Sequence, residues 1–282
     1  MKVLIDPAEV NTLQKSGQHV VFIDARGGPD AHSRYRNGHL EGAFYVDLES
    51  ELSTKAADAA DGGRHPLPDP EKFGDLLGEL GISPPTIVVV YDDKNGANAA
   101  ARFWWMMRAC GHEQVYIVNG GWKALARAGM PVSIVETARP AKAASYPVSN
   151  WVMPLATMNE VERTAGRPGH LVIDVREAYR YRGEGEPFDL IAGHIPGAVN
   201  IPYVDNMDAD GEFLSAAALA QIYKPAVDGV KPGNIIVHCG SGVTACHTLV
   251  AMEEAGLSGA KLYVGSWSEW SCNGKPVATG EQ

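Results

Sequence analysis

One cysteine occupies a position that can turn a thiol into a nucleophile. Cys239 ends the apolar run Ile235-Ile-Val-His238, and the small residues Gly240-Ser-Gly242 follow before apolar residues recur at helical spacing from Val243. We therefore expect Cys239 between a strand and the first turn of a helix. Unpaired N–H groups and the helix dipole favour negative charge there, so the backbone alone can stabilise a thiolate and an anion bonded to its sulfur.

The residues after Cys239 distinguish a reactive cysteine from one that only packs in the core. A lone cysteine at a strand end is commonly inert packing. Here Val243 is the one large side chain between Cys239 and Thr244, so we expect a concavity lined by N–H groups that is open to a ligand. The sequence favours a sulfur nucleophile, with the transferred atom held by the N–H groups of Gly240, Gly242, Val243 and Thr244.

Five short blocks follow one another along the second half of the chain: Asp174-Val-Arg176, Arg180-Tyr-Arg-Gly183, Gly193-His-Ile-Pro-Gly-Ala198, Cys239-Gly-Ser-Gly-Val-Thr-Ala-Cys246 and Gly265-Ser-Trp-Ser-Glu-Trp270. In this order they resemble the two-domain rhodanese family of sulfurtransferases, specifically its 3-mercaptopyruvate sulfurtransferase branch. The resemblance implies that the thiolate takes a sulfane sulfur from a small donor, holds it as a persulfide and passes it on. The acceptors it implies are thioredoxin, a small thiol or cyanide.

The resemblance also assigns roles to further residues. Ser241 stands where the mercaptopyruvate branch has a serine that assists proton handling, and Arg180 aligns with a substrate arginine, whose fork suits a carboxylate. Thr244 is equally well explained as an ordinary helix cap. Family analogy also allows a relay in which Asp30 and His39 act on Ser241.

The charge of the loop bears on the choice of donor. The thiosulfate branch resembles Cys-Arg-Lys-Gly-Val-Thr, whose cations balance a doubly charged donor, whereas Gly240 and Ser241 stand here. A monoanionic donor, 3-mercaptopyruvate, is favoured for this reason. The mercaptopyruvate branch commonly has a second arginine after a Glu-Pro pair, but Phe188 follows that pair in this chain. Arg182 is the candidate that could take over the role of substrate arginine.

Other functions remain open. Thiosulfate is the alternative donor, and a non-catalytic persulfide carrier serving a dedicated partner is an alternative to an enzyme. A phosphatase of the same fold would need an arginine at the far end of the loop to clamp phosphate oxygens. Ala245 and Cys246 stand there instead, which disfavours a phosphatase.

The chain is a tandem duplication. Four blocks of the first half, at residues 19–26, 38–43, 87–92 and 116–122, are matched in order by blocks at 170–176, 193–198, 235–239 and 262–267. Strand-like runs alternate with helical patterns, for example at residues 70–80 and 97–110, which predicts parallel sheets. We expect an α/β protein of two rhodanese-like domains, 1–144 non-catalytic and 145–282 catalytic, each a parallel sheet covered by helices on both faces.

Comparison of the two halves separates structure from function. Asp92 stands where the second half has Cys239, and a carboxylate cannot accept a sulfane sulfur, so we expect the first domain to close one side of the cleft or to be purely structural. The pairs Asp24/Arg26 and Asp174/Arg176 occur in both halves. A repeated fold requirement, such as a salt bridge, explains these two pairs better than catalysis.

Composition limits the possible partners. The 282 residues carry a formal charge of −10, which argues against nucleic acid and an anionic membrane as partners. The four cysteines show neither disulfide-framework nor zinc-ligand spacing, so we expect reduced thiols, no metal and no organic cofactor. No secretory segment follows Lys2 and no apolar run reaches membrane length, and we expect a cytoplasmic protein.

Overall fold

Apolar strands buried on both faces form the centre of each half of the chain. The computed structural model describes residues 2–54, 57–141 and 144–281. In the first half, five parallel strands lie in the order β1-β6-β5-β2-β4, namely β1 (Leu4–Ile5), β6 (Val115–Val118), β5 (Ile87–Tyr91), β2 (Val20–Arg26) and β4 (Phe44–Asp47). In the second half, four parallel strands lie in the order β11-β10-β8-β9, namely β11 (Lys261–Leu262), β10 (Ile235–His238), β8 (Leu171–Asp174) and β9 (Val199–Asn200).

Helices cover both faces of the first sheet. The helices of this half are α1 (Pro7–Lys15), α2 (Ala31–Asn37), α3 (Pro70–Glu79), α4 (Ala99–Ala109) and α5 (Gly121–Arg127). Along β5, Val88 and Val90 pack in the cluster that includes α3 and α4, while Val89 and Tyr91 pack in the cluster that includes α1 and α5. This alternation explains the continuous run of apolar residues in the strand.

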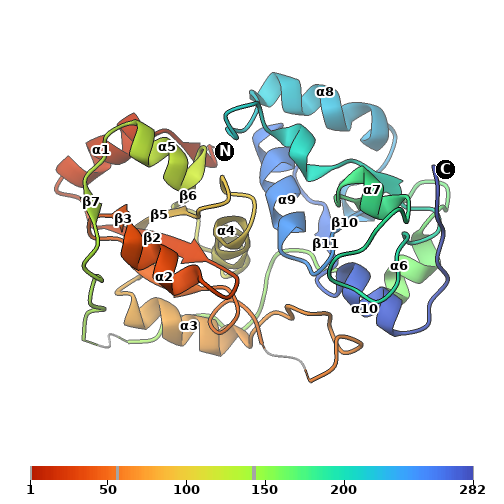
Figure 1. Cartoon of the computed structure of the whole chain (residues 1–282), viewed down its shortest axis with the longest axis horizontal. Helices are drawn as coiled ribbons and strands as arrows, with labels where there is room; N and C mark the ends of the chain where they lie inside the picture. Colours follow the sequence, from red (N-terminus) through yellow and green to blue (C-terminus); the bar gives the residue numbers. More distant parts are fainter. Residues whose placement is uncertain (1, 55–56, 142–143, 282) are drawn as a thin grey trace.

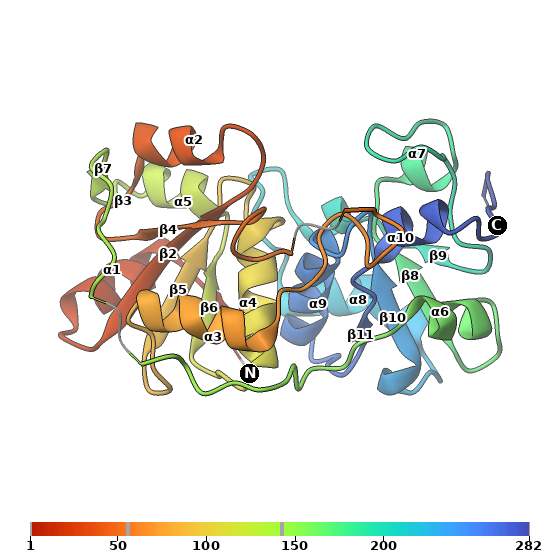
Figure 2. The same cartoon turned by 90° about the horizontal axis from the view of Figure 1, so that it is seen from below.

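The second sheet is covered in the same way. Its helices are α6 (Met158–Thr164), α7 (Ala178–Tyr181), α8 (Ala216–Val227), α9 (Thr244–Glu254) and α10 (Ser266–Cys272), with 3₁₀ turns at Tyr203–Asn206 and Pro232–Asn234. Ile235 and Val237 of β10 pack with α8 and α9, and Ile236 packs with α6 and α10. The predicted fold class, two α/β domains with parallel sheets covered on both faces, is confirmed (Figures 1 and 2).

The two halves share one apolar core. Helices α4 and α9 lie side by side at the centre of the molecule (Figure 1), and their buried residues belong to a single cluster that extends into both sheets. The first half also reaches across to the second, because the stretch at residues 57–69 lies beside α10 (Figure 2). There the Arg64 N–H donates to Ser268 Oγ at 3.1 Å, and Asn273 donates to the carbonyl of Ala60 at 2.8 Å.

Some features lay outside the expectations. A short antiparallel pair joins β3 (His39–Leu40) to β7 (Val132–Ser133) beside the first sheet. Between β7 and α6 the described residues form neither helix nor strand, and the boundary at residues 144/145 stays a prediction. In the described part of the chain, no helix has the length and hydropathy that a membrane crossing needs.

Candidate functional site

Cys239 lies between β10 and α9, at a pocket of about 530 Å³ that both halves line. Only 3% of the residue is exposed, and the pocket gives its side chain an opening. From the second half, Arg180, Phe188 and the loop around Cys239, except Gly242, line the pocket, and from the first half Glu49, Arg64 and His65 are among the lining residues. The pocket therefore lies at the interface of the halves, where ligand sites commonly occur.

The backbone of the loop after Cys239 is arranged to receive an anion. Gly242 has a positive φ of 75°, and a Cβ there would lie 2.3 Å from the Val264 carbonyl oxygen, so a glycine is required. Among the residues that the structure describes, no acceptor is hydrogen-bonded to the N–H groups of residues 240–245. Buried N–H groups normally have a partner. Their convergence next to a sulfur atom favours a bound negative charge.

The first half contains the same ring of N–H groups with an anion already inside it. Asp92, which follows β5 as Cys239 follows β10, accepts four backbone hydrogen bonds, from Lys94, Gly96, Asn98 and Ala100, at 2.9, 2.7, 3.0 and 3.1 Å. The carboxylate fills the space that a ligand would need. This internal comparison explains why the first half lacks a nucleophile and supports an anion-binding role for the loop at Cys239.

Ser241 is the first member of a chain of polar contacts that ends at Glu49. Its hydroxyl lies 2.8 Å from Nδ1 of His65, and Nε2 of His65 lies 3.0 Å from Glu49 Oε2. A carboxylate only accepts, so Nε2 carries the proton and Nδ1 accepts from the Ser241 hydroxyl while the ring is neutral. The hydrogen bond with His65 lowers the pKa of Glu49, so this carboxylate holds the ring in one tautomer at neutral pH.

The structure does not bring Asp30 and His39 to Ser241, contrary to the expectation of a relay through them. His39 is fully buried; its Nδ1 lies 2.9 Å from the Tyr35 carbonyl oxygen and its ring stacks on the Tyr35 ring at 3.8 Å. Asp30 is an exposed residue at the N-terminus of α2. The histidine bonded to Ser241 is His65, which the sequence did not single out because its segment has no periodicity and contacts the loop from 176 residues away.

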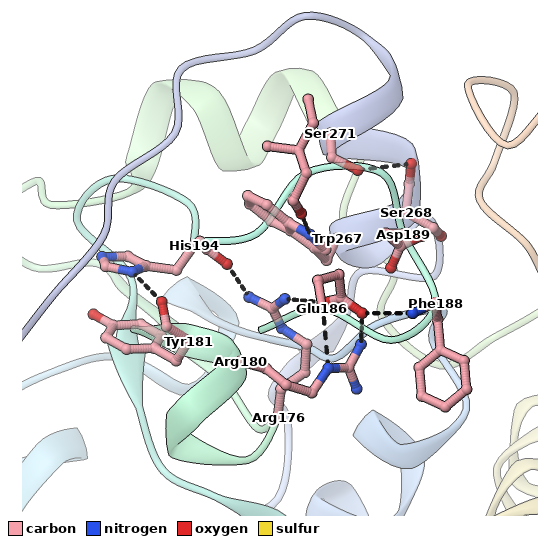
Figure 3. A network of polar contacts seen from close by, with 12 residues as sticks. Arg176, Arg180, Tyr181, Glu186, Phe188, Asp189, His194, Trp267, Ser268 and Ser271 are labelled. Atoms are coloured by element: carbon pink, nitrogen blue, oxygen red, sulfur yellow. Dashed lines mark hydrogen bonds and ion pairs between the residues drawn. The ribbon is translucent and has the colours of Figure 1, made fainter. Parts of the chain in front are cut away.

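Arg180 is buried and held rigidly at the pocket. Nη2 donates to Glu186 Oε1 at 2.7 Å and Nε donates to Oε2 at 3.3 Å. Figure 3 shows Glu186 between the guanidinium groups of Arg180 and Arg176, and Arg176 Nη1 also donates to it, at 3.1 Å. A Cβ on Gly240 would lie 3.1 Å from Arg180 Nη2. The structure thus places Arg180 directly over the nucleophile loop.

A second arginine reaches the loop from the first half. A Cβ on Gly240 would lie 3.2 Å from Nη2 of Arg64, whose guanidinium forms an ion pair with the buried Asp189. The Phe188 ring lies 5.6 Å from the guanidinium of Arg64 and 5.1 Å from that of Arg180. Arg64 thus stands at the pocket where a second substrate arginine was expected.

Arg182 does not reach the pocket, contrary to the expectation. Its guanidinium is partly exposed and donates to Glu184 at 2.7 Å, and it lines a different surface hollow together with Tyr181 and Pro202. Thr244 and Val243 do line the pocket, Thr244 as the first residue of α9 and Val243 immediately before it. The second arginine at the pocket is therefore Arg64, and not Arg182, which follows Arg180 by two residues.

Several polar residues are structural. The predicted salt bridges are confirmed: Arg26 lies 2.6 Å from Asp24, and Arg176 lies 2.6 Å from Asp174, all four side chains being buried. Burial lowers the pKa of His238, which lies within a fully enclosed environment. The neutral His238 ring is enclosed in the core and cannot reach a sulfur donor bound in the pocket. Among the described residues no group of three metal-ligating side chains comes together.

Comparison with known proteins agrees with this geometry. The family model for the rhodanese-like domain matches residues 6–128 and 157–272. A protein of Pseudomonas aeruginosa described as a "Probable 3-mercaptopyruvate sulfurtransferase" is 40% identical over 250 residues, covering 88% of this chain and 86% of the relative. The thiosulfate sulfurtransferase of Gallus gallus is 35% identical, covering 86% and 81%. The crystal structure of the 3-mercaptopyruvate sulfurtransferase SseA from Escherichia coli superimposes with a TM-score of 0.76 at 28% identity, covering 95% of this chain and 99% of that one.

Proposed function

The chain belongs to the rhodanese family, as a sulfurtransferase of two rhodanese-like domains, and from this premise we propose that it moves a sulfane sulfur from 3-mercaptopyruvate through a Cys239 persulfide to a thiol or cyanide. The observation that carries the choice of donor is the contact of 2.8 Å between Ser241 and His65 beside Cys239. A relay for protons is useful when the leaving group must be protonated.

The first half-reaction forms one bond and breaks another. The Cys239 thiolate attacks the sulfur of 3-mercaptopyruvate, an S–S bond forms, and the C–S bond breaks with its electron pair left on carbon as the enolate of pyruvate. The proton of the donor's thiol passes through the Ser241 hydroxyl to Nδ1 of His65, whose positive charge Glu49 balances, and it then returns through Ser241 to the enolate carbon, which leaves the outer sulfur as a persulfide anion. The products of the half-reaction are pyruvate and the Cys239 persulfide.

The second half-reaction returns the enzyme to its starting state. An acceptor thiolate or cyanide attacks the outer sulfur, and the Cys239 thiolate leaves. The N–H groups of residues 240–245 hold negative charge on the outer sulfur in the persulfide and on Cys239 after release. A small thiol, cyanide or the exposed thiol of thioredoxin all fit this chemistry, because the pocket opens at the interface of the halves.

The arginines support a carboxylate donor. Arg180 and Arg64 both approach Gly240, and planar guanidinium groups bind carboxylates in a bidentate manner. Carboxylates already partner both arginines, so the pocket offers less positive charge than its arginines alone suggest. This favours a monoanion over the dianion thiosulfate, which is the second candidate donor. Its leaving group, sulfite, needs no proton, so a thiosulfate enzyme would have little use for the Ser241–His65 contact.

Parallel kinetics with the two donors test the proposal. We expect a higher kcat/KM for 3-mercaptopyruvate than for thiosulfate in the wild type, and no turnover of either donor by Cys239→Ser. Undiminished turnover by Cys239→Ser would refute the mechanism, and a preference for thiosulfate would refute the choice of donor. Mass spectrometry that finds one added sulfur without repeated turnover to small acceptors would identify a carrier instead.

A further inference from the structure

Arg102 projects from the first half beneath the nucleophile loop. It lies on α4, the helix that packs against α9 between the two sheets (Figure 1), and it is fully buried. Nη1 donates to the carbonyl oxygen of Gly242 at 3.1 Å, and Nη2 donates to the carbonyl oxygen of His65 at 2.9 Å. One guanidinium thus contacts the loop after Cys239 and the residue that is bonded to Ser241.

This arginine differs from the other buried arginines in its partners. Arg26, Arg176 and Arg180 each form an ion pair with a buried carboxylate. No carboxylate lies within ion-pair distance of Arg102 among the residues that the structure describes, and its Nε has no hydrogen-bond partner there. An arginine keeps its charge at neutral pH, and a buried charge without a counter-ion is strongly unfavourable. Such a cation indicates that the resting protein holds an anion nearby.

The ionisable groups that feel the charge of Arg102 are the thiols of Cys246 and Cys239. Cys246 is not the anion. Burial raises its pKa to about 12, and its Sγ lies 3.4 Å from the Gly242 carbonyl oxygen, to which only a protonated thiol can donate. Cys239 is the thiol that lines the pocket. Of these two thiols, Cys239 is therefore the one to which Arg102 can serve as a counter-charge.

We propose that Arg102 is a positioning residue by which the first domain supplies the buried counter-charge of the Cys239 thiolate and fixes the loop around it. The charge lies on the core side of the loop, and its two hydrogen bonds hold Gly242 and His65 in register with each other. This inference rests on the proposed function only in naming Cys239 as the reacting sulfur. It gives the first domain a direct part in activating a nucleophile that the second domain carries.

Other groups face Cys239 from the pocket side. Arg180, from α7, and Tyr203, from the 3₁₀ turn, both interact electrostatically with the thiol, and Arg64 lies over Gly240. None of the three supplies an unpaired positive charge. The two arginines form ion pairs with their own carboxylates, and Tyr203 is neutral because burial raises its pKa. From the strand side, His238 is neutral because burial lowers its pKa. Among the described residues around Cys239, Arg102 is thus the fully buried cation without a carboxylate partner.

The pH dependence of alkylation at Cys239 tests the proposal without a sulfur donor. Iodoacetamide is added from about pH 5 to about pH 10, and mass spectrometry follows the peptide that contains Cys239. For Arg102→Gln we expect the midpoint of the pH–rate profile to rise by at least about one pH unit, which is a tenfold slower reaction at any pH below the midpoint. For Arg102→Lys, which keeps the charge, we expect a rise of less than about half a unit.

The matched control is Arg26→Gln, which removes a buried arginine of the same domain that has its own carboxylate. We expect this variant to be less stable with an unmoved midpoint. A folded Arg102→Gln with an unmoved midpoint would overturn the proposal, and so would an Arg102→Lys midpoint raised by one unit despite the retained charge. If Arg102→Gln does not fold, Arg102→Met takes its place with the same expected rise, and an unmoved midpoint in the folded Arg102→Met variant overturns the proposal equally. Because alkylation requires no turnover, these outcomes are independent of whether 3-mercaptopyruvate is the donor.

Discussion

Replacement of Ser241 by alanine separates the two donor hypotheses. The change removes the hydroxyl that lies 2.8 Å from His65 Nδ1 and leaves Cys239, the loop glycines and both pocket arginines in place. With 3-mercaptopyruvate, the enolate then lacks its positioned proton donor. General acid catalysis contributes at least about a hundredfold, so we expect kcat to fall by about 100-fold, or about 2.7 kcal/mol in the activation free energy.

Ser241→Ala should retain most of the wild-type kcat when thiosulfate is the donor. Sulfite leaves as an anion without a proton, so we expect kcat for thiosulfate to change less than about threefold. The assays are the formation of pyruvate from one donor and of sulfite from the other, with cyanide as a common acceptor. His65→Asn, which removes the ring and keeps a polar side chain, should show the same donor-dependent pattern. An equal loss with both donors would show that Ser241 shapes the loop rather than transferring a proton, and would refute the relay.

Three further predictions concern single contacts. Arg180→Met should lower kcat/KM for 3-mercaptopyruvate by about 30-fold, as expected for a lost charge-assisted contact, while the matched control Arg182→Met, outside the pocket, should change it less than about threefold in the same steady-state assay. Asp92→Ala leaves four N–H groups without their acceptor, those of Gly96 and Ala100 in buried hydrogen bonds and those of Lys94 and Asn98 in part-buried ones, so urea unfolding should show a loss of about 3 kcal/mol; a loss below about 1 kcal/mol would contradict this account of the first-half loop. Because its hydrogen bond with His65 lowers the pKa of Glu49, that contact stabilises the fold fully above the ordinary carboxyl range and is lost as the pH falls through the lowered pKa, so the difference in Tm between the wild type and Glu49→Gln should begin to shrink at about pH 4 and vanish at still lower pH; a difference that stays constant down to about pH 2 would be inconsistent with this.

The features that sequence analysis predicted correctly are those with a local cause. An apolar run followed by glycines and a helical pattern places Cys239 at the end of a parallel strand, whatever the rest of the chain does. The same holds for the helices at residues 70–79 and 99–109, which match the expected ranges closely. The pairs Asp24/Arg26 and Asp174/Arg176 were also predictable, because a repeated pair two residues apart in both halves has a common structural cause.

The partner of Ser241 was not predictable in this way. His65 and Glu49 lie in a segment without periodicity, and they meet the loop through tertiary folding alone. His39 was proposed because it belongs to a recognisable block, yet that block recurs in the second half. His39 stacks on Tyr35 at 3.8 Å, and His194 stacks on Tyr181 at 3.7 Å, each with its Nδ1 bonded to the carbonyl of that tyrosine. The recurrence marks both histidines as structural.

This comparison suggests where function lies in a duplicated protein. The Asp/Arg pairs common to both halves serve the fold of each domain, whereas the loop N–H groups have different partners in the two halves, because in the first half they donate to Asp92. The residues to which we assign the chemistry each occur in one half only: Cys239 in the second half, and Arg64, His65 and Arg102 in the first. Because the two halves meet in one shared core, a first half that has Asp92 in place of a cysteine can still take part in the reaction that we propose.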